Sequence, residues 1–182
     1  MLHTKIPTTV FTGFLGAGKT SLIRNLLQQS QGRRIALIIN EFGDIGIDRE
    51  VLLGCGDATC SDDSIVELAN GCICCTVADD FVPTMQQLLQ RTPPPDHIVI
   101  ETSGLALPKP LIKAFNWPEI STRVTVDGVV AVVDGAAVRD GLFTVDPDAL
   151  AAQRAADEAL DHETPIEELF EEQLASADLV VV

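Results

Sequence analysis

The residues from Gly13 to Thr20, GFLGAGKT, fit the pattern G-x-x-x-x-G-K-[ST]. Glycines at this spacing let successive backbone N–H groups turn toward one centre, and the N-terminus of a following helix adds its positive dipole end. Lys19 would then reach the β- and γ-phosphate oxygens, and Thr20 would give a hydroxyl ligand to Mg²⁺. The alternative is a tight turn that binds nothing. The pattern predicts a nucleoside triphosphate site whose binding residues are Gly13, Gly16, Ala17, Gly18, Lys19, Thr20 and Ser21.

A carboxylate, Glu101, closes the apolar run 98–100 and precedes Thr102-Ser103-Gly104. A Mg²⁺ site beside a phosphate loop needs a carboxylate at the end of a neighbouring strand, and we expect Glu101 to supply it. The alternative is a solvated residue at a strand end. Asp134 also closes an apolar run, but Asp-Gly after a strand commonly forms a turn, so we interpret Asp134 as a turn residue.

Three of the five cysteines are crowded into Cys72-Ile73-Cys74-Cys75. The odd number and the crowding favour reduced thiolates and a metal over a disulfide framework. Thiolates are soft ligands that select Zn²⁺, Co²⁺ or similar ions over Mg²⁺. All three sulfurs, or two of them with a donor from elsewhere, could bind the ion, and the alternative is cysteines that fill the core. Cys55 and Cys60 lack the usual paired-ligand spacing, and we interpret them as packing residues.

The elements that would position these residues alternate along the chain. Apolar runs predict strands over residues 6–12, 34–40, 97–101, 124–133 and 178–182, and amphipathic runs predict helices over residues 19–29, 77–91 and 165–175. This order predicts an α/β fold with a doubly wound, mostly parallel sheet, and the motif over residues 13–20 makes it the P-loop NTPase type. Residues 41–71 are irregular, and such a long stretch in a compact domain usually carries function.

Charge and composition exclude several classes of partner. The 182 residues include 12 Lys and Arg against 27 Asp and Glu, a net charge of −15, so we expect one acidic domain that binds neither nucleic acid nor membrane surfaces. Tyrosine is absent and Trp117 is alone, which argues against a platform for stacking bases. The start of the chain lacks a signal-peptide core, so a cytoplasmic location is expected. His3, His97 and His162 are dispersed and are interpreted as surface or packing residues.

Taken together, residues 13–20, Asn40-Glu41-Phe42-Gly43-Asp44, residues 70–75 and residues 101–104 resemble the CobW family of P-loop GTPases, relatives of the UreG and HypB metallochaperones. The resemblance covers nearly the whole chain. It implies one GTPase domain over residues 1–182 that binds GTP and Mg²⁺ at Lys19 and Thr20. It further implies a switch segment at Glu41, a Walker B acid at Glu101 and a metal motif. The catalytic candidates are Lys19, Glu41 and Glu101, with Glu41 orienting the attacking water, and the metal candidates are Cys72, Cys74, Cys75, Thr20 and Glu101.

The cargo that the resemblance implies is cobalt, because residues 67–80, 97–118 and 124–134 resemble the members associated with cobalt supply to cobalamin synthesis. The implied function is a GTPase that couples GTP hydrolysis to delivery of Co²⁺ to an acceptor such as a cobalt-inserting chelatase, with a homodimer as the implied assembly. Zn²⁺ transfer within the same family, a non-enzymatic nucleotide-binding metal sensor, and a kinase or ATPase with incidental thiols are the alternatives.

Two features of the family lie beyond Val182. In the family, the strand that resembles residues 178–182 leads into an Asn-Lys-x-Asp loop that reads guanine, and a smaller C-terminal domain follows. The chain is therefore expected to be a fragment truncated before the guanine-specificity loop, with the C-terminal domain absent. Residues 40–75 begin beside the phosphate site and end at the thiolates, so we expect them to couple nucleotide and metal by an order–disorder change.

Overall fold

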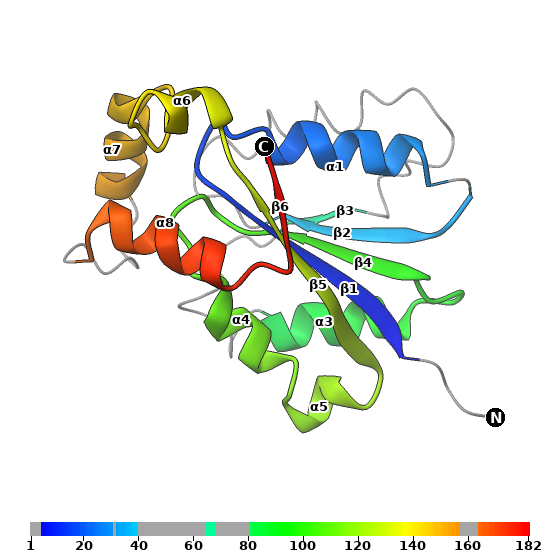
Figure 1. Cartoon of the computed structure of the whole chain (residues 1–182). Helices are drawn as coiled ribbons and strands as arrows, with labels where there is room; N and C mark the ends of the chain where they lie inside the picture. Colours follow the sequence, from blue (N-terminus) through cyan, green and yellow to red (C-terminus); the bar gives the residue numbers. More distant parts are fainter. Residues whose placement is uncertain (1–4, 31, 40–64, 68–80, 157–163) are drawn as a thin grey trace.

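The computed structural model describes residues 5–30, 32–39, 65–67, 81–156 and 164–182 (Figure 1). The strands are β1 (Ile6–Thr12), β2 (Ile35–Ile39), β3 (Ile65–Glu67), β4 (His97–Glu101), β5 (Val124–Val132) and β6 (Leu179–Val181). The helices are α1 (Lys19–Gln28), α3 (Val82–Gln90), α4 (Pro108–Ala114), α5 (Pro118–Ser121), α6 (Gly135–Arg139), α7 (Pro147–Ala156) and α8 (Ile166–Ala175).

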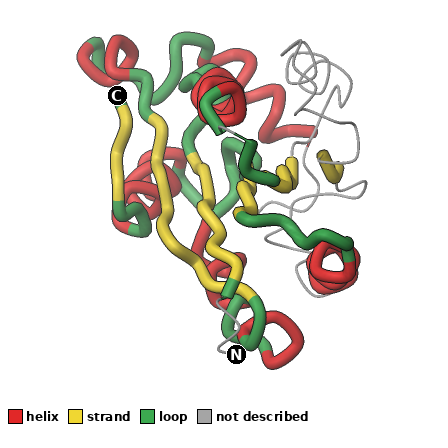
Figure 2. The backbone as a smooth tube through the Cα atoms, turned by 90° about the vertical axis from the view of Figure 1, so that its right-hand side faces the viewer, coloured by secondary structure: helices red, strands yellow, loops and turns green. Residues whose placement is uncertain are grey.

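All six described strands form one sheet in the order β3-β2-β4-β1-β5-β6, and every pair is parallel. Figure 2 shows the strands side by side with helices around them. β1 lies between β4 and β5, and Phe11 near its end is level with Glu101 at the end of β4. The parallel α/β architecture predicted from the alternating pattern is confirmed. The loops that follow β1 and β4 therefore leave the sheet next to each other.

Helices cover both faces of the sheet, and a third group lies beyond the ends of the strands. In Figure 1, α1 lies on one face and α3, α4 and α5 lie on the other, while α6, α7 and α8 gather at one end. Side chains alternate along a strand, so Ile98 and Ile100 of β4 pack with Met85 of α3, whereas Val99 packs with Ile23 of α1. Because both faces are covered, β2 is entirely apolar and β4 is apolar between His97 and Glu101, while β1 also carries the buried Thr8 and Thr12.

Several elements differ from the prediction. Residues 65–67 form strand β3 inside the stretch that was predicted to be irregular. The prediction was wrong there because a strand of three residues is too short to show a periodic pattern. The predicted helix over residues 77–91 is described from Val82 to Gln90, and residues 77–80 lie outside the described part of the chain. Helices α4, α5, α6 and α7 were not predicted. Three of them begin with proline, which favours the first turn of a helix but reads as a break in a sequence pattern.

No helix within the described ranges is both long enough and apolar enough to cross a lipid bilayer.

Candidate nucleotide-binding site

The loop between β1 and α1 depends on glycine for its shape. Gly13, Gly16 and Gly18 have φ values of +139°, +79° and +97°, which side chains other than glycine rarely adopt. A Cβ on Gly13 would lie 2.2 Å from the carbonyl oxygen of Val132, so the loop leaves β1 in close contact with the end of β5. Gly18 is the N-cap of α1. The loop thus reaches the helix N-terminus with a backbone path that the predicted motif requires.

Lys19 folds back over this loop from the first position of α1. The residue is only 6% exposed, and its Nζ donates to the carbonyl oxygen of Phe14 at 3.2 Å. The Ala17 amide also donates to Phe14 O, at 3.1 Å, while Ser21 is exposed in the first turn of the helix. The first N–H groups of an α-helix have no acceptor within the helix and carry its positive dipole end. The Lys19 ammonium group and the first amides of α1 therefore lie at the same turn of the chain, and this arrangement suits an anion.

Thr20 and Glu101 meet across 81 residues of sequence. Thr20 Oγ1 donates to Glu101 Oε1 at 2.9 Å, and Glu101 is 2% exposed. The contact follows from topology, because β4 lies beside β1 and Glu101 is the last residue of β4. A hydroxyl and a carboxylate are the hard oxygen donors that Mg²⁺ prefers, and Mg²⁺ usually takes only one or two such ligands besides water and phosphate. The donor set fits the Mg²⁺ ion expected with a bound nucleotide.

The other predicted site residues lie outside the described part of the chain. These are Glu41, Cys72, Cys74 and Cys75; Cys55 and Cys60, which we interpreted as packing residues, lie there too. Within the described ranges, no three His, Cys, Asp or Glu side chains are grouped so that they could hold a metal ion. The metal motif therefore stays a prediction from the sequence.

The three neighbouring strands β3, β2 and β4 end level with one another. Ile39 at the end of β2 is level with Glu67 of β3 on one side and with Glu101 of β4 on the other. All three residues end parallel strands, so they lie in one row across the sheet. The chain therefore leaves both β2 and β3 at the sheet edge that carries Glu101.

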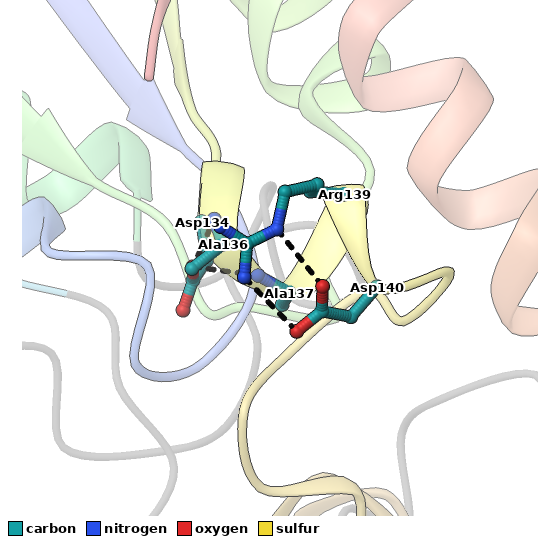
Figure 3. A network of polar contacts seen from close by, with 5 residues as sticks. All are labelled: Asp134, Ala136, Ala137, Arg139 and Asp140. Atoms are coloured by element: carbon teal, nitrogen blue, oxygen red, sulfur yellow. Dashed lines mark hydrogen bonds and ion pairs between the residues drawn. The ribbon is translucent and has the colours of Figure 1, made fainter.

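Asp134 has a structural role at the end of β5. Its Oδ1 accepts hydrogen bonds from the amides of Ala136 and Ala137, both at 3.0 Å, and this caps helix α6 (Figure 3). Arg139 and Asp140, at the other end of the same short helix, form an exposed ion pair. The carboxylate of Asp134 is thus engaged in local turn chemistry, as the Asp-Gly sequence indicates.

Comparison with protein families identifies the chain. A family model described as the nucleotide-binding domain of CobW/HypB/UreG matches residues 7–182. The chain belongs to the CobW/HypB/UreG family. A protein of Sinorhizobium sp named zinc chaperone CobW is 67% identical over 178 residues, which are 98% of this chain and 50% of the relative. A protein of the same name from Pseudomonas aeruginosa is 55% identical over 182 residues, or 98% of this chain and 48% of the relative.

A solved structure agrees with this family assignment. The Zn(II)-bound YjiA GTPase from E. coli superposes with a TM-score of 0.54 at 25% identity, covering 97% of this chain and 48% of that one. The chain thus spans about half the length of the curated relatives it matches. The glycine loop, Lys19 and the Thr20–Glu101 pair lie within the residues that the family model matches.

Some contacts of the glycine loop in this CobW-family chain were not predicted from the sequence. The ring of Phe14, inside the phosphate loop, packs against Phe143 and Phe170 with centroid distances of 6.2 and 5.7 Å. The hydroxyl of Thr144 donates to the carbonyl oxygen of Leu15 at 3.0 Å. An aromatic residue at the first variable position of the motif was the available signal in the sequence, but it does not indicate which distant residues pack against it.

The loop that follows β4 also touches the phosphate loop. A Cβ on Gly104 would lie 2.8 Å from the backbone nitrogen of Leu15, so the two backbones approach as closely as only glycine allows. Gln173 of α8 is 2% exposed, and its Nε2 donates to the carbonyl oxygens of Gly104 and Ala106 at 2.9 and 3.4 Å. Helix α8 therefore supports the phosphate loop from outside through an intermediate loop.

A groove of about 620 Å³ lies elsewhere, between the second half of α1 and the amino ends of β2 and β4. His97 lines it, and its Nε2 is 2.9 Å from Thr9 Oγ1. Burial lowers the pKa of His97 below its ordinary value; the nearby Asp127 opposes this effect and Arg33 adds to it. The groove is lined by the far half of α1 and not by the glycine loop, so we assign His97 the packing role that the sequence indicated.

Proposed function

We propose that this chain binds Mg·GTP in the loop 13–20 and works in a protein that couples GTP hydrolysis to the delivery of Zn²⁺. The observation that carries the proposal is the burial of Lys19 over the glycine loop beside the Thr20–Glu101 hydrogen bond. Lys19 would neutralise phosphate oxygens, and Thr20 with Glu101 would hold Mg²⁺. When bound, Mg²⁺ neutralises charge that develops on the phosphates during transfer. Guanine as the base is supported by family membership.

The coupling part of the proposal is supported by the row formed by Ile39, Glu67 and Glu101. Glu41, the candidate for orienting water, follows Ile39 by two residues, and Cys72 follows Glu67 by five. The two strands that precede these residues therefore end level with the acid that would serve the Mg²⁺ ion. Zn²⁺ leads as the cargo because both relatives are named zinc chaperones. Co²⁺, which the sequence resemblance implied, is the competing ion, and the acceptor protein and a homodimer stay predictions.

The nucleotide part can be tested with two lysine variants. Lys19→Ala removes the buried ammonium of the loop, whereas Lys109→Ala removes a half-exposed one that pairs with Glu172 at 2.7 Å. A hydrogen bond to a charged group contributes about 1.5–3 kcal/mol, so Lys19→Ala is expected to weaken Mg·GTP binding about 10- to 100-fold. Lys109→Ala should bind like the wild type, because exposed ion pairs contribute little. Equal affinity of all three proteins for Mg·GTP would refute the proposed site.

The metal part can be tested by measuring Zn²⁺ and Co²⁺ affinities with Mg·GDP and with a non-hydrolysable GTP analogue. A 100-fold difference between the two nucleotides would correspond to about 2.7 kcal/mol of coupling, within the ordinary range for linked sites. Cys74→Ser with Cys75→Ser should abolish that difference. Equal Zn²⁺ affinities would refute coupling, and phosphate release that Zn²⁺ leaves unchanged but Co²⁺ accelerates would reassign the cargo to cobalt. Undetectable phosphate release would favour a metal sensor.

A further inference from the structure

The turn formed by residues 143–146 lies against the outer side of the phosphate loop. Thr144 is 3% exposed, and its Oγ1 donates to Leu15 O at 3.0 Å across 129 residues of sequence. The same oxygen accepts from the amide of Asp146 at 3.3 Å, which orients the hydroxyl hydrogen away from that amide. A Cβ on Gly16 would be 3.9 Å from both Thr144 Oγ1 and Val145 Cγ2. The turn therefore follows the loop at van der Waals distance.

Thr144 donates to the carbonyl of the peptide group that joins Leu15 to Gly16, and the N–H of that peptide group faces the phosphate side. A trans peptide is planar, so the carbonyl of Leu15 and the N–H of Gly16 point in opposite directions. In a phosphate-binding nest the N–H groups point inward at the anion. Holding Leu15 O outward consequently aims the Gly16 N–H inward. Gly16 has a φ of +79° and no side chain, so its own torsions restrain this peptide only weakly.

The turn is itself well anchored, which a restraint requires. The ring of Phe143 meets Phe14 edge-on at 81° and lies 5.2 Å from Phe170 of α8. Asp146 Oδ1 accepts from the amide of Ala149 at 2.9 Å and so caps the start of α7. The turn is thus fixed to two helices and to the ring of Phe14 as well as to Leu15. A group held in this way can restrain a flexible loop.

We propose that Thr144 is a positioning residue of the nucleotide site. Its hydroxyl holds the Leu15–Gly16 peptide in the orientation that presents the Gly16 N–H to a phosphate oxygen. This role rests on the proposed function, since it presupposes that the loop binds a nucleotide. It adds to the motif a residue that lies about 130 positions away and touches no phosphate.

The test compares three variants with the wild-type chain. Thr144→Val keeps the shape of the side chain and removes the donor, and Thr144→Ser keeps the hydroxyl. Thr8→Val is the matched control, because Thr8 is fully buried in β1 and its Oγ1 has no hydrogen-bond partner in the described structure. Affinity for Mg·GTP and the melting temperature are measured for each protein. The chemical shift of the Gly16 amide on adding Mg·GTP gives a readout of the peptide itself.

Thr144→Val is expected to weaken Mg·GTP binding about five- to tenfold, the range for one lost hydrogen bond, and to reduce the shift of the Gly16 amide. Thr144→Ser and Thr8→Val should bind like the wild type. A Thr144→Val protein that melts earlier but binds Mg·GTP normally would overturn the inference, and so would a Thr144→Ser protein that binds as weakly as Thr144→Val. A wild-type chain that binds no Mg·GTP would overturn the proposed function and this inference with it.

Discussion

Replacing Gly104 by alanine tests whether the contact between the two loops shapes the phosphate site. A Cβ at this position would lie 2.8 Å from Leu15 N, 3.2 Å from Phe14 C and 3.3 Å from Phe14 Cα. All three are backbone atoms of the phosphate loop, so no side chain can rotate away to make room. Gly104 does not have a positive φ in the structure, so alanine would cause a steric clash and no backbone strain.

The size of the effect follows from that clash. Overpacking a filled site by one methyl group costs about 1–3 kcal/mol. With a urea m-value of about 2 kcal/mol/M for a domain of this size, a loss of about 2 kcal/mol lowers the unfolding midpoint by about 1 M. Relief of the clash must move Phe14 and Leu15, which misplaces the amides that follow. We therefore also expect Mg·GTP binding to weaken about tenfold, a change of about 1.4 kcal/mol.

Gly128→Ala provides the control, because it adds the same methyl group in strand β5. There the first atom that the new Cβ would meet is Asp178 Oδ2, at 3.9 Å. Its unfolding midpoint and its affinity for Mg·GTP should stay close to the wild-type values, within about 0.5 kcal/mol. The two variants are compared by urea unfolding and by titration with a fluorescent GTP analogue. If Gly104→Ala matches Gly128→Ala in both measurements, the contact between the loops does not constrain the site.

Two further predictions concern residues outside the phosphate site. Burial is the chief cause that lowers the pKa of His97 in the folded protein. The unfolded chain therefore binds the proton more readily, and the free energy of unfolding decreases as the pH falls from about 6.5 toward the folded-state pKa. The melting temperature should therefore fall more steeply between pH 7.5 and pH 5.5 for the wild type than for His97→Gln, and parallel curves would contradict this assignment. Asp134→Ala should lower the free energy of unfolding by about 0.5–1 kcal/mol through loss of the α6 cap and leave Mg·GTP affinity unchanged. Asp140→Ala, in an exposed ion pair, should change neither quantity, and weaker Mg·GTP binding by Asp134→Ala would mean that Asp134 does more than cap the helix.

The sequence was sufficient for the parts of the site that depend on local rules. The glycine loop, β1 and α1 are adjacent in the chain, and the spacing of the glycines indicates a backbone conformation that few other residues can adopt. Glu101 could be placed beside Thr20 because strands in a parallel sheet end at one edge, so a strand-terminal acid is a reasonable partner for the loop. These predictions used spacing and topology, and neither requires knowledge of side-chain packing.

The contacts that Phe143, Thr144, Phe170 and Gln173 make with the phosphate loop and the loop after β4 could not be predicted in this way. Nothing near Thr144 in the sequence indicates that the chain returns to Leu15, because the contact arises from the packing of α7 and α8 beyond the sheet. Short helices such as α4 and α5 also escaped, since four to seven residues contain too few turns for a periodic pattern. Gly104 was part of the motif that carried the family resemblance, but its role in the close approach to Leu15 is visible only in the structure.

Besides the contact from Thr144, two restraints on the phosphate loop come from residues 101–104, at the end of β4 and just after it. On the inner side, Glu101 accepts from Thr20 at the start of α1. On the outer side, Gly104 lies three residues later and packs on Leu15, while its carbonyl accepts from Gln173 of α8. A shift of this four-residue segment must therefore move Glu101, the acid proposed for Mg²⁺, and the backbone that packs on Leu15 together. For that reason, we expect substitutions in α8 to change nucleotide affinity although α8 is not expected to contact a phosphate. The effect should be largest at Gln173, whose side chain donates to the carbonyl oxygen of Gly104.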